Sequence, residues 1–408
     1  MATTVEDNEL MTRTDNGAPL GEMLREHYWI PAIPADKLEA DGRPFRVRML
    51  GENYVAFRDT EGKVGLLDEL CPHRRVSLAL GRNEEGGLRC IYHGWKFDTE
   101  GNLIDAPNIE GNQEAFCKSV KLNRYKAVER GGIVWAYLGK AKTPPAFPAL
   151  PFVDLPAESR SVTSKEVPSN WLQGVEASMD TTHVSFLHSS VVEMGGKTQR
   201  KNMIKKTSAK LEYEDRPYGF RVAAIRDIGE GKNYVRVNNF VMPWYAVICP
   251  PGEGEPSTVF FSTPVDDVTH RAWFVHFNPG HRLGMTPMSA TPDTWNFPPL
   301  PPGGPDDNWG QSRELMQRGH FSGFPQHLAT EDFAMFMSQG PIYDRSKEQL
   351  CSSDGAVLKV RHTILQAVKQ YQAGQVPKVA ESREDDYASA RSIGAEMDAD
   401  GNWRELSV

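Results

Sequence analysis

Two short segments of the chain each pair a cysteine with a histidine. Cys71 precedes His73 by two positions, and Cys90 precedes His93 by three. Two thiolates and two imidazoles are the ligand set of a Rieske [2Fe–2S] centre, in which the thiolates hold one iron and the histidines hold the other. We therefore predict that these four residues bind such a cluster, which carries one electron. The rest of the chain must then supply an acceptor for that electron.

The same residue types can bind zinc, which is the alternative interpretation. Zinc fingers usually pair cysteine with cysteine and histidine with histidine along the chain. Here both pairs are mixed, and the glycines at positions 81, 86 and 87 predict a turn between the two ligand loops. Both features favour the two-iron cluster over a structural zinc site.

A second group of possible ligands lies in the segment from Asp180 to His188. Asp180 and His183 are three residues apart, so on a helix they share a face. His188 needs a widened turn or a break after His183 to reach the same ion. Two histidines and one carboxylate form the facial triad of non-haem Fe(II) oxygenases, which leaves open positions for dioxygen or substrate.

The carboxylate of this triad has several candidates. If Asp180 keeps another role, the best candidate is Asp332, on a later helical stretch, with Glu331 as the alternative and Asp344 as a weaker one. The opposing interpretation is that two of the 11 histidines lie five residues apart without any common function. An electron carrier needs an electron acceptor, however, and this favours the iron site.

Short segments of strand-forming residues, separated by glycine-containing turns, extend from about residue 45 to residue 138. This pattern is typical of a small antiparallel β domain. The proline-rich segment 143–152 predicts a boundary. We therefore expect an N-terminal segment at 1–43, which packs on the catalytic domain, and a cluster-binding β domain at 44–145.

The remainder of the chain, 146–408, has a different pattern. Helical spacing at 170–190 is followed by partly alternating strand-like segments at 205–280, as expected for a sheet covered on one face. Two further helical stretches lie at about 329–337 and 354–372. The expected fold class is α+β, with a catalytic domain that carries the second metal site.

Composition and charge exclude several classes of protein. The chain has 408 residues, 25% of them charged, and a net charge of −8, which argues against a nucleic-acid partner. We find no apolar run long enough to span a membrane, and the polar N-terminus is unlike a secretory signal. Cys117, Cys249 and Cys351 are scattered and odd in number, so we expect no disulfide framework and a cytoplasmic setting.

The sequence resembles the Rieske-type aromatic ring-hydroxylating oxygenases over almost its whole length. Its first metal segment reads CPHRRVSLALG and then CIYHGWKFDTEG, and its second carries Asn170-Trp171 before Glu176, Asp180, His183 and His188. The stretch EDFAM, followed by SQGPI and DRS, is similar to the phthalate dioxygenase group, which also includes aryl O-demethylases. The resemblance implies a Rieske β domain inserted in a helix-grip catalytic domain, an antiparallel sheet around a long helix.

The resemblance also implies assembly into homotrimers or stacked trimers. In such an assembly, His93 of one subunit approaches Asp180 of the next, and Asp180 touches His183. A carboxylate between two ligand imidazoles fixes their orientation and tautomer. Asp180 is therefore expected to be a catalytic residue that connects the two metal centres. The alternative is an ordinary carboxylate on a helix surface.

The activity implied is that of a terminal oxygenase, which uses dioxygen to hydroxylate or O-demethylate an aromatic carboxylate at a mononuclear Fe(II). No glycine-rich dinucleotide fingerprint is visible in the sequence. NAD(P)H must therefore act through a partner reductase, with or without a separate ferredoxin. The alternatives are a Rieske electron-transfer protein without oxygenase activity and a structural zinc protein.

A carboxylate substrate calls for an arginine, whose guanidinium pairs with carboxylates through two hydrogen bonds. Arg200, Arg226 and Arg236 are the candidates in the catalytic domain. Arg236 stands out because it interrupts an apolar strand, where an unpaired inward-facing charge would be costly. The alternative is that its side chain faces water.

Overall fold

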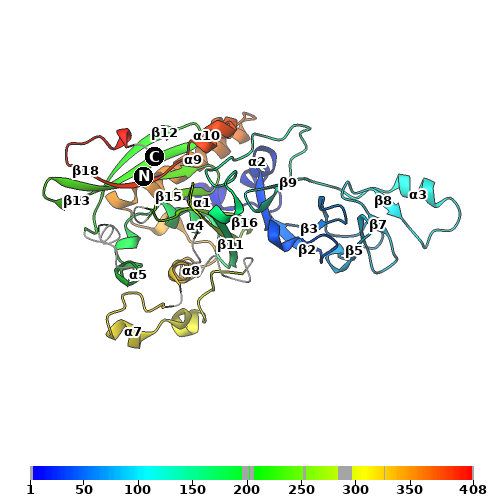
Figure 1. Ribbon diagram of the computed structural model, residues 1–408, viewed down its shortest axis with the longest axis horizontal. Coiled ribbons are helices and arrows are strands. Elements are labelled where there is room, and N and C mark those ends of the chain that lie inside the picture. Colours follow the sequence, from blue (N-terminus) through cyan, green and yellow to red (C-terminus); the bar gives the residue numbers. More distant parts are fainter. Residues whose placement is uncertain are drawn as a thin grey trace. The chain divides into compact units, whose positions relative to one another are not determined.

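The computed structural model describes residues 3–194, 202, 206–250, 254–283, 296–325 and 327–406. The chain divides into two compact units (Figure 1). Residues 24–144 form one unit, and residues 1–23 with 145–408 form the other. Residues 24–43, which the sequence analysis grouped with the catalytic domain, thus belong to the cluster-binding unit. None of the helices in the described ranges is long and apolar enough to cross a membrane.

Three small antiparallel sheets make up the unit of residues 24–144. Their orders are β1-β10-β9, β2-β3-β4 and β5-β6-β7-β8. The strands are β1 (Ile30–Pro34), β2 (Phe45–Met49), β3 (Glu52–Arg58), β4 (Val64–Asp68), β5 (Arg82–Glu84), β6 (Gly87–Arg89), β7 (Lys96–Phe97), β8 (Leu103–Asp105), β9 (Lys126–Arg130) and β10 (Ile133–Tyr137), and the helix is α3 (Gln113–Ser119). Residues 24–43 join this unit because β1 pairs with β10.

The core of this β domain contains both cysteines that are predicted to bind the cluster. Cys71 and Cys90 are buried together with Val55, Phe57 and Phe97 from the surrounding strands. Burial of these apolar side chains holds the two loops against the strands, since each buried side chain of this size contributes about 1.5–3 kcal/mol. The sheets thereby position the loops that carry the predicted cluster ligands.

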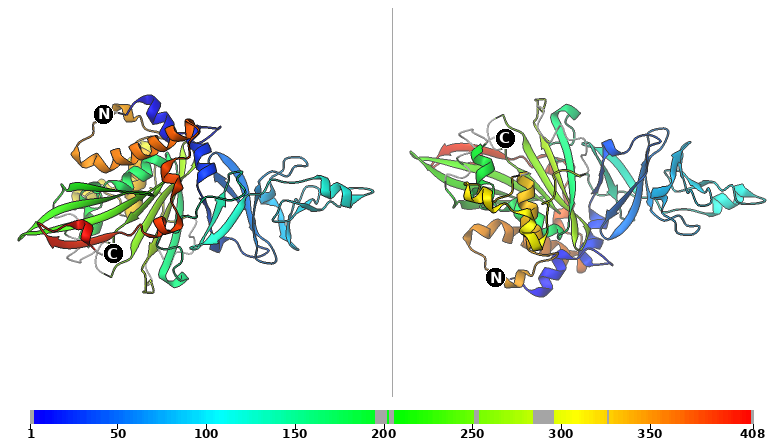
Figure 2. Two further views of the ribbon diagram at one scale, coloured as in Figure 1. Left: turned by 90° about the horizontal axis from the view of Figure 1, so that it is seen from above. Right: turned by 90° about the horizontal axis from the view of Figure 1, so that it is seen from below.

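The other unit is built on one antiparallel sheet of eight strands. Its order is β11-β17-β16-β15-β14-β13-β12, and β18 pairs with β14 off this path. The strands are β11 (Arg160–Val167), β12 (Lys210–Arg216), β13 (Gly219–Gly229), β14 (Lys232–Val241), β15 (Tyr245–Ile248), β16 (Ser257–Asp266), β17 (Thr269–Phe277) and β18 (Ile393–Asp398). Figure 2 shows the green strands of this sheet with the orange helix α9 beside them.

The structure describes several helices in this unit. They are α1 (Val5–Thr12), α2 (Pro19–His27, which continues into the other unit), α4 (Trp171–Met179), α5 (Ser189–Met194), α7 (Arg313–Gln317), α8 (Leu328–Ser338), α9 (Gly355–Gln372) and α10 (Glu384–Ala388). Helix α4 lies against β15, β16 and β17 and also touches α8 and α9. Gly174 permits this close approach, because a Cβ there would lie 2.7 Å from Oγ of Ser262. The α+β class with antiparallel sheets is confirmed.

A buried ion network fixes α4 to the C-terminal part of the same unit. Glu176 on α4 accepts hydrogen bonds from Nε of Arg345 at 2.8 Å and from Nε of Arg361 at 2.7 Å. The hydroxyl of Tyr343 donates to the second carboxylate oxygen at 3.0 Å. All three charged side chains are buried, and Glu348 supplies the second negative charge through Arg361, so the pairing of two carboxylates with two arginines is what makes this burial tolerable. The network holds the helix that leads into Asp180.

Candidate active site and metal centres

The two ligand loops of the β domain share one backbone pattern. The N–H of Cys71 donates to the carbonyl five residues later at 2.9 Å, and the N–H of Cys90 does the same at 2.8 Å. Each cysteine carbonyl accepts the N–H four residues later, from Arg75 at 2.9 Å and from Gly94 at 3.0 Å. Both of these donors have positive φ, 59° and 80°. The chain therefore turns back sharply after each pair of predicted ligands.

These loops bring the predicted cluster ligands to one place. The ring centroids of His73 and His93 are 4.4 Å apart, and His73 stacks on Trp95 at 4.6 Å. Burial, with Cys90 close by, raises the pKa of the Cys71 thiol to about 11. Nδ1 of His73 is buried without a hydrogen-bond partner in the described part of the chain. Buried thiols and an orphaned imidazole nitrogen are donors that fit an iron–sulfur cluster.

The second constellation forms where α4 ends. Asp180 caps this end with extended backbone dihedrals, and its Oδ1 accepts the N–H of Thr182 at 2.7 Å. His183 begins a separate 3-10 turn, His183–Ser185. The expectation that Asp180 and His183 share a helix face is therefore wrong, because the side chain of Asp180 competes with helical hydrogen bonding and ends α4. The turn still leaves Oδ2 of Asp180 3.6 Å from Nδ1 of His183.

His183, His188 and Asp332 meet on the same side of the unit. Nε2 of His183 lies 3.7 Å from Oδ1 of Asp332, and Nε2 of His188 lies 3.1 Å from the same oxygen. One potential ligand atom from each residue lies within 4.8 Å of the others. Nδ1 of His183 is buried and has no hydrogen-bond partner within the described ranges. This set fits a facial triad for a divalent metal.

The two other carboxylates considered for the triad do not belong to this set of converging ligand atoms. Oε2 of Glu331 is 2.6 Å from Nδ1 of His188, so it meets the ring nitrogen that does not face Asp332. The hydroxyl of Ser322 donates to the second oxygen of Glu331. Asp344 caps a 3-10 turn through a hydrogen bond to the backbone. Glu331 is therefore placed to orient His188, and Asp344 is not near the triad's ligand atoms.

Carboxylates set the electrostatics of this site. Burial raises the pKa of Asp332, but His188, His183 and His327 outweigh burial and lower it overall. Burial lowers the pKa of His188, but Asp332 and Glu331 outweigh burial and raise it to about 10. A proton on His188 therefore balances the carboxylates in the metal-free protein. A divalent cation would take the place of that proton.

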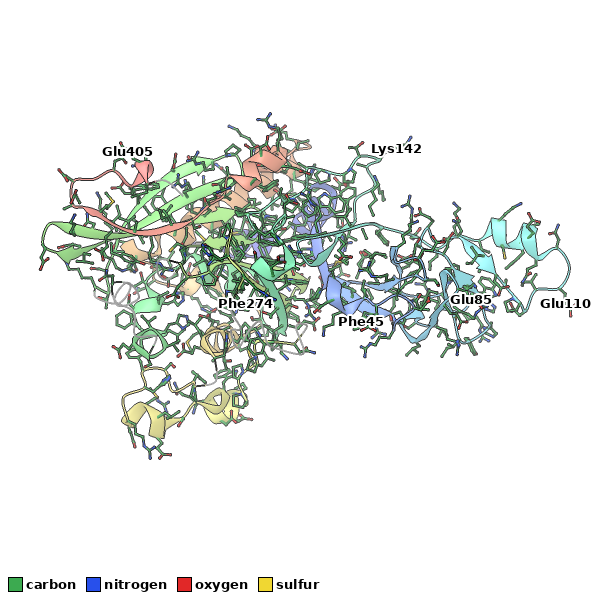
Figure 3. All side chains as sticks on the ribbon, viewed as in Figure 1. Phe45, Glu85, Glu110, Lys142, Phe274 and Glu405 are labelled. Carbon is green, nitrogen blue, oxygen red and sulfur yellow. The ribbon has the colours of Figure 1, made fainter. Side chains whose placement is uncertain are left out.

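A cavity of about 330 Å³ opens beside these residues. Pockets of roughly 300–1,000 Å³ commonly bind small molecules. Much of the wall is apolar, and its larger side chains include Phe260, Phe333 and Phe274, which is labelled in Figure 3. The polar lining residues are Asp180, His183, His188 and Asp332 near the triad, and Ser178, Thr181, Arg236, Asn238, Cys249, Thr258, His276 and His327 elsewhere in the wall. The cavity thus combines an apolar interior with a few polar groups.

The three arginines suggested as substrate ligands have different positions. Arg200 lies outside the described residues. Arg226 is buried and donates to the carbonyl of Thr181 at 3.0 Å, and it is not part of the cavity wall. Arg236 is buried, lines the cavity and donates from Nε to Sγ of Cys249 at 3.2 Å. Of the two that can be placed, Arg236 is the one that faces the cavity.

Sequence reasoning missed several polar residues of the cavity wall: Asn238, Cys249, Thr258, His276 and His327. Asn238 follows Arg236 by two positions in a strand and so shares its face. This spacing of two residues from Arg236 could have identified Asn238 from the sequence. The other residues come from different elements, so no local pattern connects them.

Residues 28–125 match the Rieske [2Fe-2S] domain family, and residues 136–408 match the family described as LigXa C-terminal domain like. The phthalate 4,5-dioxygenase oxygenase subunit of Pseudomonas putida is 37% identical over 397 residues, covering 91% of this chain and 88% of the relative. The chain belongs to the Rieske oxygenases. The 3-chlorobenzoate-3,4-dioxygenase oxygenase subunit of Comamonas testosteroni is 34% identical to this Rieske oxygenase, covering 95% of the chain and 94% of the relative.

Solved structures share the fold of this Rieske oxygenase. Dicamba monooxygenase bound to dicamba matches with a TM-score of 0.57 at 17% identity, covering 86% of this chain and 99% of that one. The terminal oxygenase of carbazole 1,9a-dioxygenase from Nocardioides aromaticivorans matches with a TM-score of 0.57 at 21% identity, covering 88% and 98%. The expected resemblance to Rieske oxygenase subunits, including the phthalate dioxygenase group, is confirmed.

As a Rieske oxygenase, the protein is a terminal oxygenase component, an oxidoreductase that incorporates oxygen from dioxygen. Its cofactors are a Rieske [2Fe–2S] cluster and a mononuclear non-haem iron, and NAD(P)H acts indirectly, through a partner protein. A solved structure of carbazole 1,9a-dioxygenase contains the oxygenase in complex with a ferredoxin. The alternatives of a structural zinc protein and of a carrier without oxygenase activity do not fit this family.

Proposed function

We propose that this Rieske oxygenase hydroxylates or O-demethylates an aromatic carboxylate, such as a phthalate or a methoxylated aromatic acid. One observation carries the proposal: Arg236 is 5% exposed and lines the cavity that also contains the triad residues. Within the described residues, its hydrogen-bond partner is the thiol of Cys249 and not a carboxylate. A ligand carboxylate would neutralise this charge through two parallel hydrogen bonds. Relatives named for phthalate and 3-chlorobenzoate support this substrate class.

We assign the mononuclear iron to His183, His188 and Asp332. The support is their convergence at one place and the presence of two imidazoles and one carboxylate, the ligand set of non-haem Fe(II) oxygenases. Bound iron supplies the activation of dioxygen. The chain's own residues then have three tasks: to hold the metal, to orient the acid through Arg236 and to keep water out with the apolar wall.

We assign the cluster to Cys71, His73, Cys90 and His93. Electrons would reach it from a partner reductase, with or without a ferredoxin. In a homotrimer or stacked trimers, His93 of one subunit would approach Asp180 of the next. Asp180 would in turn contact His183, which connects the cluster of one subunit with the iron of its neighbour. The 3.6 Å distance between Asp180 and His183 supports the last part of this path. The cytoplasmic setting expected from the scattered cysteines stays a prediction.

The experiment that tests the substrate class compares matched ligands and matched variants. Binding of benzoate, phthalate and methoxybenzoates to the holoenzyme is measured by anaerobic calorimetry, with the corresponding benzamides as uncharged controls. We expect the acids to bind more tightly than the amides and Arg236→Met to weaken acid binding by about 10–100-fold, the effect of losing a charge-assisted hydrogen bond worth about 1.5–3 kcal/mol. Amide binding should change little.

Turnover of the same panel with a competent reductase then identifies the product. Formation of a hydroxylated or demethylated product from an aromatic acid agrees with the proposal. Equal affinity of wild type for acids and amides, or unchanged acid binding by Arg236→Met, would show that the cavity does not select carboxylates.

A further inference from the structure

His327 occupies the start of α8, in the wall of the cavity. It caps this helix: the backbone N–H of Ala329 donates to Nδ1 of His327 at 3.0 Å. A backbone N–H can only donate, so Nδ1 must be the nitrogen without a proton. The proton of the neutral ring is then on Nε2. The start of α8 therefore fixes the tautomer of this histidine.

The surroundings also favour a neutral ring. Burial lowers the pKa of His327, Asp332 opposes this shift and His188 adds to it. A second proton on Nδ1 would also break the bond to Ala329 and place a positive charge at the positive end of the helix dipole. His327 thus offers one uncharged N–H donor in a fixed position.

Among the described residues, no acceptor is seen for this donor. Within the described part of the chain, the hydrogen bond of the His327 ring is the one at Nδ1, and the residue is partly buried. The nearby His276 differs, because its Nδ1 lies 2.9 Å from Oγ1 of Thr258 and its Nε2 is buried. His327 belongs to the cavity wall, and because Nδ1 serves the cap, Nε2–H is the ring group through which it would meet a molecule there.

The strands that line the cavity form its floor, and their spacing gives the distance between this donor and Arg236. Asn238, Ile248, Thr258 and His276 form one row across β14, β15, β16 and β17 in the register of the sheet. Three strand spacings of about 4.8 Å separate the ends of this row by about 14 Å. Arg236 is on the same face of β14 as Asn238, two residues earlier, and so belongs to the first end of the row.

His327 belongs to the other end. It lies close enough to His276, on β17, to contribute to lowering the pKa of that residue. The middle of the floor is largely apolar, with Ile248 in the row itself and Phe260 and Phe274 in the row beside it. The hydroxyl of Thr258, also in the row, is engaged with His276. The cavity therefore has a cation at one end, an uncharged N–H donor at the other and an apolar surface between them.

We propose that the Nε2–H of His327 donates a hydrogen bond to an oxygen atom of the substrate, at the end of the cavity away from Arg236. This inference rests on the proposed function and narrows its substrate class. The favoured substrates are aromatic acids that carry a second oxygen substituent, a methoxy, hydroxyl or carboxyl group, on the part of the ring away from the first carboxylate. His327 is a specificity-determining residue in this arrangement.

Two substitutions distinguish the helix-capping role of His327, through Nδ1, from its proposed role as a donor through Nε2–H. Asparagine is a favoured N-cap, so His327→Asn can keep the bond to Ala329, but its amide is too short to reach the position of Nε2. Glutamine is a weaker cap, but the amide of His327→Gln reaches roughly as far as Nε2. We expect both variants to retain the cluster and iron, which visible spectra and iron analysis can verify before binding is measured.

The measurement is anaerobic calorimetry of the holoenzyme with 3- and 4-methoxybenzoate and the methylbenzoates of matching geometry. We expect wild type to bind at least one methoxybenzoate about tenfold more tightly than its methyl counterpart, about 1.4 kcal/mol. His327→Asn should reduce this ratio to about one and leave methylbenzoate affinity nearly unchanged, whereas His327→Gln should keep part of the ratio. A purely structural role would weaken both ligands of a pair equally.

The outcomes distinguish the inference from the function on which it rests. If His327→Asn keeps the full ratio, or if wild type binds both ligands of every pair equally, His327 does not recognise a substrate oxygen. In either case, tight binding of acids over amides leaves the proposed function intact. If wild type has no preference for acids, the proposed function and this inference both fall.

Discussion

Oε2 of Glu331 lies 2.6 Å from Nδ1 of His188. Glu331 is fully buried and directly precedes Asp332 on α8. The imidazole of His188 is therefore held between two successive carboxylates of one helix, one at each ring nitrogen. Asp332 and Glu331 were competing candidates for one role in the sequence, and the structure gives them complementary positions.

This arrangement predicts that Glu331 controls iron affinity through His188. Groups that orient a ligand histidine typically contribute about 10–100-fold to metal affinity. We expect Glu331→Ala to lower iron affinity by about that factor and Glu331→Gln, which can still accept the Nδ1–H, to lower it less. Chelator competition followed by iron analysis provides the measurement.

The ligand assignment itself predicts that Asp332→Ala loses the mononuclear iron and turnover while the cluster remains. Full iron occupancy in Asp332→Ala would contradict this assignment.

The paired ligand loops predict which cysteines hold the cluster. Cys71→Ser or His93→Ala should abolish the red-brown colour and the Rieske-type EPR signal of the reduced protein. Cys351→Ser is a matched control, because Cys351 is exposed and belongs to the other unit, and it should retain the signal in full. A normal signal in Cys71→Ser would show that the cluster has other ligands.

The contact between Asp180 and His183 predicts an effect on electron transfer. Asp180→Asn removes the negative charge and leaves an amide that accepts through one atom only. We expect this variant to keep both metals and its oligomeric state, yet to lose most turnover, because electrons no longer reach the iron. The test is a single-turnover reaction with pre-reduced cluster and bound substrate. Cluster reoxidation at the wild-type rate would eliminate Asp180 from the electron path.

The network around Glu176 predicts a large effect on stability. Glu176→Gln leaves Arg345 buried without its counter-charge and removes one of the two carboxylates that face Arg361, which also pairs with Glu348. Breaking a buried pair in this way costs about 3–5 kcal/mol. Urea unfolding followed by tryptophan fluorescence should show this loss. Glu314→Gln is the control: its partner Arg318 is 71% exposed, so the change should stay within about 0.5 kcal/mol. Equal effects of the two substitutions would contradict the importance of the network.

The same network predicts acid sensitivity. Burial raises the pKa of Glu176, but Arg345 and Arg361 outweigh burial and lower it below the ordinary value of 4.5. A lowered pKa in the folded state contributes stability that is present above the unfolded value and is lost as pH falls through the folded value. The unfolding free energy of wild type should therefore fall below about pH 4.5, and this fall should be smaller in Glu176→Gln. An identical pH dependence in both proteins would assign the acid sensitivity to other groups.

The four residues that we assign to the cluster could be grouped from the sequence alone, because their geometry is local. Each cysteine and its histidine lie within one tight loop, closed by hydrogen bonds between residues four and five positions apart. The same applies to His183 and His188, which a short turn brings together. Here the spacing of residue types is sufficient, since few backbone conformations satisfy it.

Our choice of Asp332 over Glu331 as the proposed iron ligand required the tertiary structure. Glu331 and Asp332 are neighbours on α8, and successive side chains on a helix point about 100° apart. Which one faces the two histidines depends on how α8 packs against the sheet through Ala329, Phe333 and Phe336. No local pattern contains that information.

The cavity itself was decided by tertiary structure in the same way. Arg226 and Arg236 lie on the adjacent strands β13 and β14 and point to the same face, since Arg236 pairs with Ala224. Their roles differ because Arg226 donates a hydrogen bond to the carbonyl of Thr181, just after α4, whereas Arg236 lines the cavity. His327 joins that cavity from a separate helix. Local spacing thus determined the metal-binding loops, whereas long-range packing of helices on the sheet determined which polar groups face the substrate.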